Sequence, residues 1–140
     1  MALIIKRSLF SLLLLGIFFP ALAGRFIKTN ESIIVYPDNA YPGNAIAVEL
    51  KVIAENIFQV IAWPGKEQGA LKSFMVNYSV KEIPSWKVSS TASSVSLYTS
   101  HLKATVNLQD GSITYFDSNG KQLTSEAPNS RRLQPSMFEG

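Results

Sequence analysis

A regular alternation of apolar and polar residues between Ser94 and Glu126 constrains the fold of this chain more than any other feature. In such a pattern successive side chains point to opposite faces of a strand, so that one face is buried and the other meets solvent. The strand candidates in this stretch are Val95–Leu97, Leu102–Leu108 and Ile113–Phe116, followed by a fourth around Leu123. The pattern predicts consecutive antiparallel strands, a β-meander.

Two glycine-containing dipeptides separate the later strand candidates of this meander. Asp110-Gly111 precedes the third candidate, and Asn119-Gly120 precedes the fourth. Two-residue hairpin turns need positive φ, which Gly, Asn and Asp adopt most readily. We therefore predict a two-residue turn at each dipeptide. The meander contains no catalytic motif.

The remainder of the chain also has the pattern of short strands separated by turns. Glu55-Asn56 predicts a tight turn, and Ile57–Trp63, which is apolar on both faces, predicts an inner strand of a sheet. Eight or nine strands and no helix predict an all-β antiparallel β-sandwich. The strand candidates before the meander are Ser32–Tyr36, Ala45–Ala54, Ile57–Trp63, Phe74–Val80 and a strand that begins at Trp86–Val88.

The first 23 residues have the features of a signal peptide. Lys6 and Arg7 precede an apolar run, Leu9 to Phe19, and small residues stand at Ala21 and Ala23. We predict cleavage between Ala23 and Gly24. A membrane anchor is the alternative, but the apolar run is shorter than the roughly 20 residues that span a bilayer.

Composition limits the remaining functions. The chain has no cysteine, so it lacks both disulfides and the lipid-attachment cysteine of a bacterial lipoprotein. We therefore expect a soluble periplasmic or secreted protein, with no membrane partner after cleavage. Removal of Lys6 and Arg7 lowers the formal net charge from +3 to +1, which does not support nucleic-acid binding. The length from Gly24 to Gly140 suits one domain.

The candidates for catalysis are few. His101 is the only histidine, which excludes a multi-histidine metal site, and we interpret it as a solvent-facing or hydrogen-bonded residue. A serine nucleophile would have to recruit His101, and no Gly-x-Ser-x-Gly motif is present. Asp110 and Asp117 could be a carboxylate pair, but both flank turns, where Asp usually bonds its own backbone. We predict no catalytic, cofactor-binding or metal-binding residue and no cofactor.

Aromatic and basic residues offer two candidates for binding. A sugar-stacking platform could form from Trp63, Trp86, Tyr36 and Tyr41, although packing in the core or between domains is the expected role of Trp63. Arg131-Arg132 could bind an anion, but we expect this pair to be solvated or to face another domain. The sequence beyond Leu133, which includes Phe138, suggests a domain that is truncated at its C-terminal end.

The order of these features resembles the N-terminal domain of glycoside hydrolase family 31, especially exported bacterial α-xylosidase- and α-glucosidase-like members. Gln59 departs from the resemblance, because many members have Arg there. The segments that carry the resemblance are Leu50–Val60, Ser85–Val88, Val95–Thr99 with Leu102–Leu108, Asp110–Ile113 with Phe116–Lys121, and Arg131–Gly140.

The resemblance implies a galactose-mutarotase-like β-sandwich that packs beside a catalytic (β/α)8 barrel. In that family the barrel supplies the two carboxyl groups of a retaining mechanism, about 5 Å apart. No catalytic residue of the family falls on this sequence. The implied function is a non-catalytic domain, a fragment of an exported α-glycosidase, that helps to shape the carbohydrate pocket of its parent. The alternative is a free-standing exported sandwich that binds carbohydrate or a surface partner.

Overall fold

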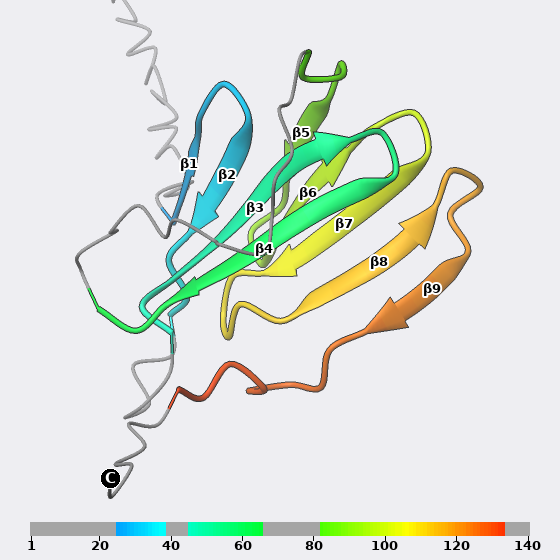
Figure 1. Ribbon diagram of the computed structural model, residues 1–140. Helices are drawn as coiled ribbons and strands as arrows, with labels where there is room; N and C mark the ends of the chain where they lie inside the picture. Colours follow the sequence, from blue (N-terminus) through cyan, green and yellow to red (C-terminus); the bar gives the residue numbers. More distant parts are fainter. Residues whose placement is uncertain (1–24, 39–44, 66–81, 134–140) are drawn as a thin grey trace, which may run out of the picture.

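The computed structural model describes residues 25–38, 45–65 and 82–133, and within these ranges the chain forms nine strands and no helix (Figure 1). The strands are β1 (Phe26–Lys28), β2 (Ser32–Val35), β3 (Ala47–Ala54), β4 (Ile57–Trp63), β5 (Lys87–Ser90), β6 (Ser94–Tyr98), β7 (Leu102–Asn107), β8 (Ile113–Asp117) and β9 (Gln122–Ser125).

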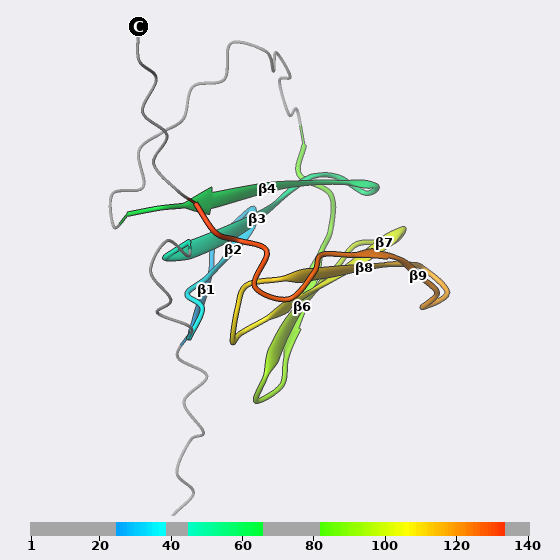
Figure 2. The same ribbon diagram turned by 90° about the horizontal axis from the view of Figure 1, so that it is seen from below.

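The strands form two antiparallel sheets. The first sheet has the order β1-β2-β3-β4, and the second has the order β5-β6-β7-β8-β9. Every strand therefore pairs with its neighbour in sequence, so each sheet is a meander. Figure 2 shows the two sheets as separate layers. The prediction of an all-β fold built from antiparallel sheets is confirmed.

The core lies between the inner faces of the two sheets. Ile33, Leu50 and Val48 of the first sheet are fully buried, and so are Leu97 and Val106 of the second. These residues occupy alternate positions, as the sequence pattern predicted. Burial of each such side chain contributes about 1.5–3 kcal/mol relative to its exposure, so this layer supplies most of the stability of a chain without disulfides.

Several predicted elements in the first half of the chain are corrected or refined. Glu55-Asn56 forms the predicted tight turn between β3 and β4. Phe26–Lys28 forms a short strand that the sequence did not indicate; it pairs with β2, and Phe26 packs against the core. β4 is the last strand of the first sheet within the described residues, so the prediction of an inner strand is wrong there.

The two glycine dipeptides of the meander do not form two-residue turns. The connection between β7 and β8 runs from Leu108 to Ser112, and the connection between β8 and β9 runs from Ser118 to Lys121. Among the described residues of these connections, only the glycines have positive φ, 74° at Gly111 and 82° at Gly120. A two-residue type I′ turn needs positive φ at both central positions, and neither Asp110 nor Asn119 has it.

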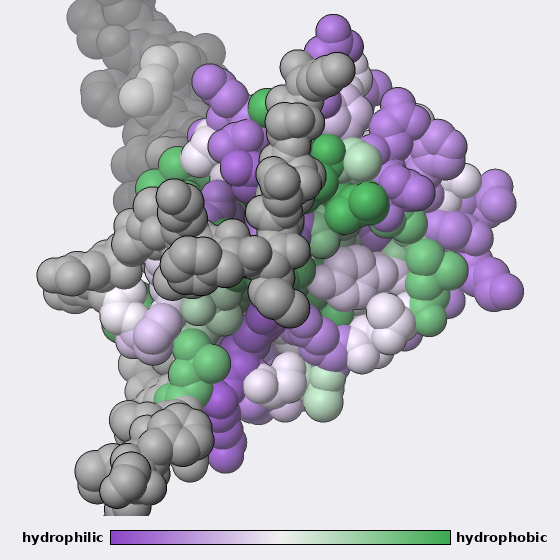
Figure 3. Space-filling model, in the orientation of Figure 1, coloured by the Kyte–Doolittle hydropathy of each residue, from purple (hydrophilic) through white to green (hydrophobic). Residues whose placement is uncertain are grey.

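Within the described residues, one side of the sandwich is open. The second sheet extends past β4, so that apolar side chains over β7–β9 are visible to the right of β4 in Figure 3. Leu123 in β9 is 55% exposed. Tyr115 in β8 is only half-buried, although its ring packs against the core. We call this region, formed by β4, β8 and β9, the open side.

Several predictions lie outside the described residues. They concern the signal peptide with its cleavage between Ala23 and Gly24, the strand Phe74–Val80, the aromatic residue Tyr41, and the tail with Phe138. Within the described ranges, no helix has the length and apolar character needed to cross a membrane.

Candidate functional site

The outward face of the second sheet carries two ordered rows of side chains. The pairing of successive strands from β5 to β9 places the residues of each row side by side, on the face of the sheet that points away from the core. The first row, here called the lysine–aromatic row, is Lys87, Tyr98, Lys103, Phe116 and Gln122. The second, here called the hydroxyl row, is Ser89, Ser96, Thr105, Thr114 and Ser125.

Lys103 holds the centre of the lysine–aromatic row. Its Nζ lies 5.4 Å from the ring centroid of Tyr98 and 4.9 Å from that of Phe116. Cations are attracted to the faces of aromatic rings at such distances, by about 0.5–1 kcal/mol at exposed sites. The two rings therefore restrict the position of the ammonium group.

Hydrogen bonds link the hydroxyl row internally and to Tyr98. The hydroxyls of Ser96 and Thr105 lie 2.9 Å apart, and the hydroxyl of Ser89 lies 2.9 Å from the phenolic oxygen of Tyr98. The hydrogen bond with Ser89 lowers the pKa of Tyr98 below its usual value, and the positive charge of Lys103 contributes to the same shift. The Tyr98 ring is thus held in place by groups on both sides.

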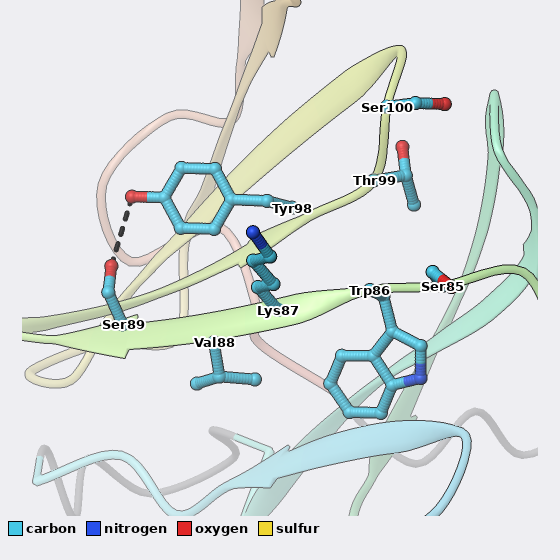
Figure 4. Close-up of a pocket in the computed structure, with 8 residues that line it drawn as sticks. All are labelled: Ser85, Trp86, Lys87, Val88, Ser89, Tyr98, Thr99 and Ser100. Atoms are coloured by element: carbon cyan, nitrogen blue, oxygen red, sulfur yellow. Dashed lines mark hydrogen bonds between the residues drawn. The ribbon is translucent and has the colours of Figure 1, made fainter.

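A depression of about 630 Å³ lies beside Tyr98, at the edge formed by β5 (Figure 4). Lys87 and Tyr98 lie on the same side of the strands there, whereas Trp86 and Val88 point to the opposite side. A second depression, of about 370 Å³, lies between Tyr98, Lys103 and the β8–β9 turn. Tyr98 forms a wall of both depressions.

His101 lies where the β6–β7 connection meets the β3–β4 turn. Its Nδ1 is 2.8 Å from Glu55 Oε2, and Ser100 donates a hydrogen bond of 2.7 Å to the same carboxylate oxygen. The hydroxyl of Thr99 donates to the backbone carbonyl of Glu55. These contacts join the two sheets at one end of the sandwich.

The cluster of Ser100, His101 and Glu55 does not have the geometry of a catalytic triad. The Ser100 hydroxyl and the Glu55 carboxylate both approach Nδ1 of His101. A triad needs the serine at one ring nitrogen and the carboxylate at the other. The His101 side chain is also 64% exposed, which provides no enclosed site. The interpretation of His101 as a hydrogen-bonded residue is confirmed.

Asp110 and Asp117 lie at opposite ends of β8 and do not form a carboxylate pair. Asp117 Oδ1 accepts hydrogen bonds from the amides of Asn119 and Lys121, as expected of a turn residue. Asp110 is only 6% exposed and accepts from the amide and hydroxyl of Ser112 and from the amide of Asn129. Burial alone would raise the pKa of Asp110, but these hydrogen bonds outweigh it and lower the pKa below 3.8.

The two tryptophans lie in different parts of the sandwich, Trp63 in the first sheet and Trp86 just before the second, and they do not form a common platform. Trp63 ends β4 and is 7% exposed, which confirms a packing role, and its Nε1 has no hydrogen-bond partner among the described residues. Trp86 precedes β5, packs against the core, and donates from Nε1 to the carbonyl of Asn30 at 3.3 Å. Lys28 Nζ lies 4.7 Å from the centroid of its ring.

The Arg131 side chain pairs with a carboxylate of the same domain, which corrects the prediction that it is solvated or faces another domain. Its Nε donates to Glu126 Oε2 at 3.1 Å, and its second contact with this carboxylate makes the pair bidentate. The Arg131 carbonyl also accepts from the amide of Ala45, which ties this segment to the start of β3. Arg132 is exposed.

The sequence analysis did not find the lysine–aromatic row. Alternation in the meander does separate Tyr98, Lys103 and Phe116 from the core residues. Their alignment in one row depends on the register between strands, which the lengths of the connections set. Because the β7–β8 connection is longer than the predicted two-residue turn, the sequence pattern alone could not give the alignment of Phe116 with Lys103.

Comparison with solved structures identifies a similar part of a known enzyme. The chain is similar to the glycoside hydrolase family 31 α-xylosidase of Xanthomonas citri, with a TM-score of 0.60 and 28% identity. The match covers 72% of this chain and 11% of the enzyme. The resemblance predicted from the sequence is thereby confirmed in the structure.

A second similar structure is an uncharacterized protein of Listeria monocytogenes, with a TM-score of 0.58 and 19% identity. This match covers 77% of the chain and 9% of that protein, and at this identity it supports the fold alone. No protein-family model matches the sequence, and no curated protein matches it either. The chain thus spans about a tenth of each similar protein.

Proposed function

We propose that this chain is the N-terminal β-sandwich domain of an exported α-glycosidase, either an α-xylosidase or an α-glucosidase, and is not catalytic itself. The observation that carries the proposal is the match to the α-xylosidase, with 28% identity over 72% of this chain but only 11% of the enzyme. In this proposal a catalytic (β/α)8 barrel supplies the carboxyl groups. The sandwich packs on the barrel and helps to shape its carbohydrate pocket.

The open side is the surface that we assign to the barrel. It combines two edge strands, β4 and β9, with apolar side chains that the first sheet does not cover. Unpaired strand edges and exposed apolar groups are usually covered by another part of the protein. Leu123 lies in the centre of β9 and serves as a marker for this contact, because it is 55% exposed.

A binding experiment with matched variants tests this assignment. The partner is the Xanthomonas citri α-xylosidase without the segment that this chain matches, and the readout is copurification with this chain. Leu123→Lys should reduce copurification, since it places a charge at the proposed contact. Ile27→Lys is the control, because Ile27 is 53% exposed but lies in β1 at the opposite edge. Equal effects of the two variants would contradict the assignment.

Export is part of the proposal and has its own test. The basic residues Lys6 and Arg7, the apolar run and the small residues before Gly24 support secretion to the periplasm or the exterior. Mass spectrometry of the protein isolated from its host should give Gly24 as the N-terminal residue. A mature protein that retains Met1 to Ala23 would contradict export with cleavage.

The second candidate function is a free-standing exported sandwich that binds carbohydrate or a surface partner. The lysine–aromatic row favours it, because half-buried aromatic rings on the outward face of a sheet can stack on sugars. A stable, cooperatively unfolding monomer that does not bind the barrel-containing partner would favour this candidate over the first.

A further inference from the structure

We propose that the outward face of the second sheet binds an acidic oligosaccharide, one whose sugars carry carboxylates. This inference concerns a surface distinct from the open side. It does not depend on the proposed attachment to a barrel, because every group that it uses lies on β5 to β9. Three features of the face support it: its aromatic rings, its hydroxyl groups and its charge.

The aromatic rings are spaced along the lysine–aromatic row. Tyr98 on β6 and Phe116 on β8 are separated by β7, so the rings are roughly 10 Å apart across the strands. Aromatic rings offer rigid apolar faces that can cover the C–H faces of sugar rings. The depressions on the two sides of Tyr98 leave room for sugars next to its ring.

The hydroxyl row runs beside these rings. Each of its hydroxyl groups can donate and accept a hydrogen bond, as the hydroxyls of a sugar can. Short Ser and Thr side chains lose little conformational entropy on binding, in contrast to long polar chains. Within the row, Ser96 is only 7% exposed and already bonds Thr105, whereas Ser89 and Ser125 at its two ends are exposed. An extended ligand across the strands would meet the exposed hydroxyls at the two ends.

The charge of the face selects the class of sugar. Lys87 and Lys103 are the ionised residues of the two rows, and neither row contains an Asp or Glu. One carboxylate, Asp117 at the β8–β9 turn, lines the depression beside Lys103. The first sheet differs, because its outward face carries Glu49, and Lys51 there pairs with Glu31 at 2.9 Å. A face on which cations outnumber carboxylates attracts an anionic ligand. Lys103 is held between two rings, so a sugar carboxylate would meet a cation that is already positioned.

The test compares two ligands that differ only in charge. The full chain is titrated by isothermal calorimetry with a galacturonate oligosaccharide and with the same oligosaccharide after reduction of its carboxylates. We expect the reduced ligand to bind at least about tenfold more weakly, which corresponds to ~1.4 kcal/mol. Equal affinity for both ligands, or no binding of the acidic ligand, would overturn the proposal.

Variants then locate the binding on this face. Tyr98→Ala should weaken binding by about tenfold, and Lys103→Met should weaken it severalfold. Lys103→Met keeps the aliphatic stem between the rings, so it tests the site even if Tyr98→Ala does not fold. Lys51→Met is the matched control, because Lys51 belongs to β3 in the first sheet and lines neither depression. Retained affinity in both Tyr98→Ala and Lys103→Met, or an equal loss in Lys51→Met, would overturn the assignment to this face.

Discussion

The two connections of the meander that contain glycine differ in what surrounds them. In the β7–β8 connection, Gly111 is buried, and a Cβ there would lie 2.9 Å from Pro37 Cγ and 2.9 Å from Val48 Cγ2. In the β8–β9 connection, Gly120 is exposed, and a Cβ there would have no atom within 4 Å. Both glycines have positive φ. In the β7–β8 connection, glycine is therefore required both for close packing and for the positive φ. In the β8–β9 connection, it is required for the positive φ alone.

The aspartates Asp110 and Asp117 differ in the same way as the two glycines. Asp110 is buried and joins the β7–β8 connection to the amide of Asn129 far along the chain. The Asp117 carboxylate accepts hydrogen bonds within the β8–β9 turn, from the amides of Asn119 and Lys121. The β7–β8 connection is thus part of the tertiary structure, and the β8–β9 turn is a local structure at the surface.

The largest expected difference is between Gly111→Ala and Gly120→Ala. Gly111→Ala adds a clash with Pro37 and Val48 to the backbone strain, so we expect a loss of about 3 kcal/mol in the free energy of unfolding. Gly120→Ala adds strain alone, with a loss of about 1 kcal/mol. Urea denaturation of both variants measures the difference. Similar losses would show that the β7–β8 connection can relax away from the first sheet.

The aspartates give the next largest difference. Asp110→Ala leaves the partly buried amides of Ser112 and Asn129 without their acceptor, and we expect a loss of about 2–3 kcal/mol. Asp117→Ala exposes its amide partners to water, which replaces the carboxylate, so the loss should be about 1 kcal/mol. Thermal unfolding of the two variants checks the order, and a larger loss for Asp117→Ala would reverse the comparison.

Substitutions by valine sharpen the account of the exposed turn. Gly120→Val should cost about 1–2 kcal/mol, because a β-branched residue is strained at a φ of 82°. Lys121→Val should cost less, since Lys121 is exposed and has negative φ, as do the other described non-glycine residues apart from Asn129. Equal melting temperatures of the Gly120→Val and Lys121→Val variants would contradict the claim that Gly120 is needed for its backbone conformation.

The pH dependence of stability tests the buried aspartate from a different direction. The pKa of Asp110 in the folded state is lower than 3.8, the value of an unperturbed Asp. Its contribution is therefore complete above pH 3.8 and is lost as the pH falls through the folded-state pKa. Asp110→Asn should show a smaller loss of unfolding free energy on acidification than the wild type. If the free energy of unfolding fell equally with pH in the variant and the wild type, Asp110 would not contribute to stability in this way.

The sequence predicted the strands of the core better than their connections. Alternation placed Val95, Leu97 and Val106 on the buried face because burial of one face imposes a period of two. It failed at Asp110-Gly111, where the connection packs close to Pro37 and Val48, which are distant in sequence. It also placed Ile57–Trp63 inside a sheet, because apolar residues on both faces do not reveal whether a strand has one neighbour or two.

The candidate site was less predictable than the fold. The residues that bond their neighbours in sequence, such as Asp117 with Asn119, could be interpreted from local turn preferences. The Glu126–Arg131 pair and the row of Tyr98, Lys103 and Phe116 depend on strand register and on how the chain returns to the sheet. Local patterns do not specify these arrangements.

The central claim, that the chain is the non-catalytic sandwich domain of an α-glycosidase, is tested most directly by activity. The chain from Gly24 onward replaces the matching segment of the Xanthomonas citri α-xylosidase, and hydrolysis of a p-nitrophenyl α-xyloside is measured for this chimera and for the chain alone. The account predicts hydrolysis by the chimera and none by the chain alone. Hydrolysis by the rigorously purified chain, or a folded chimera without activity, would contradict it.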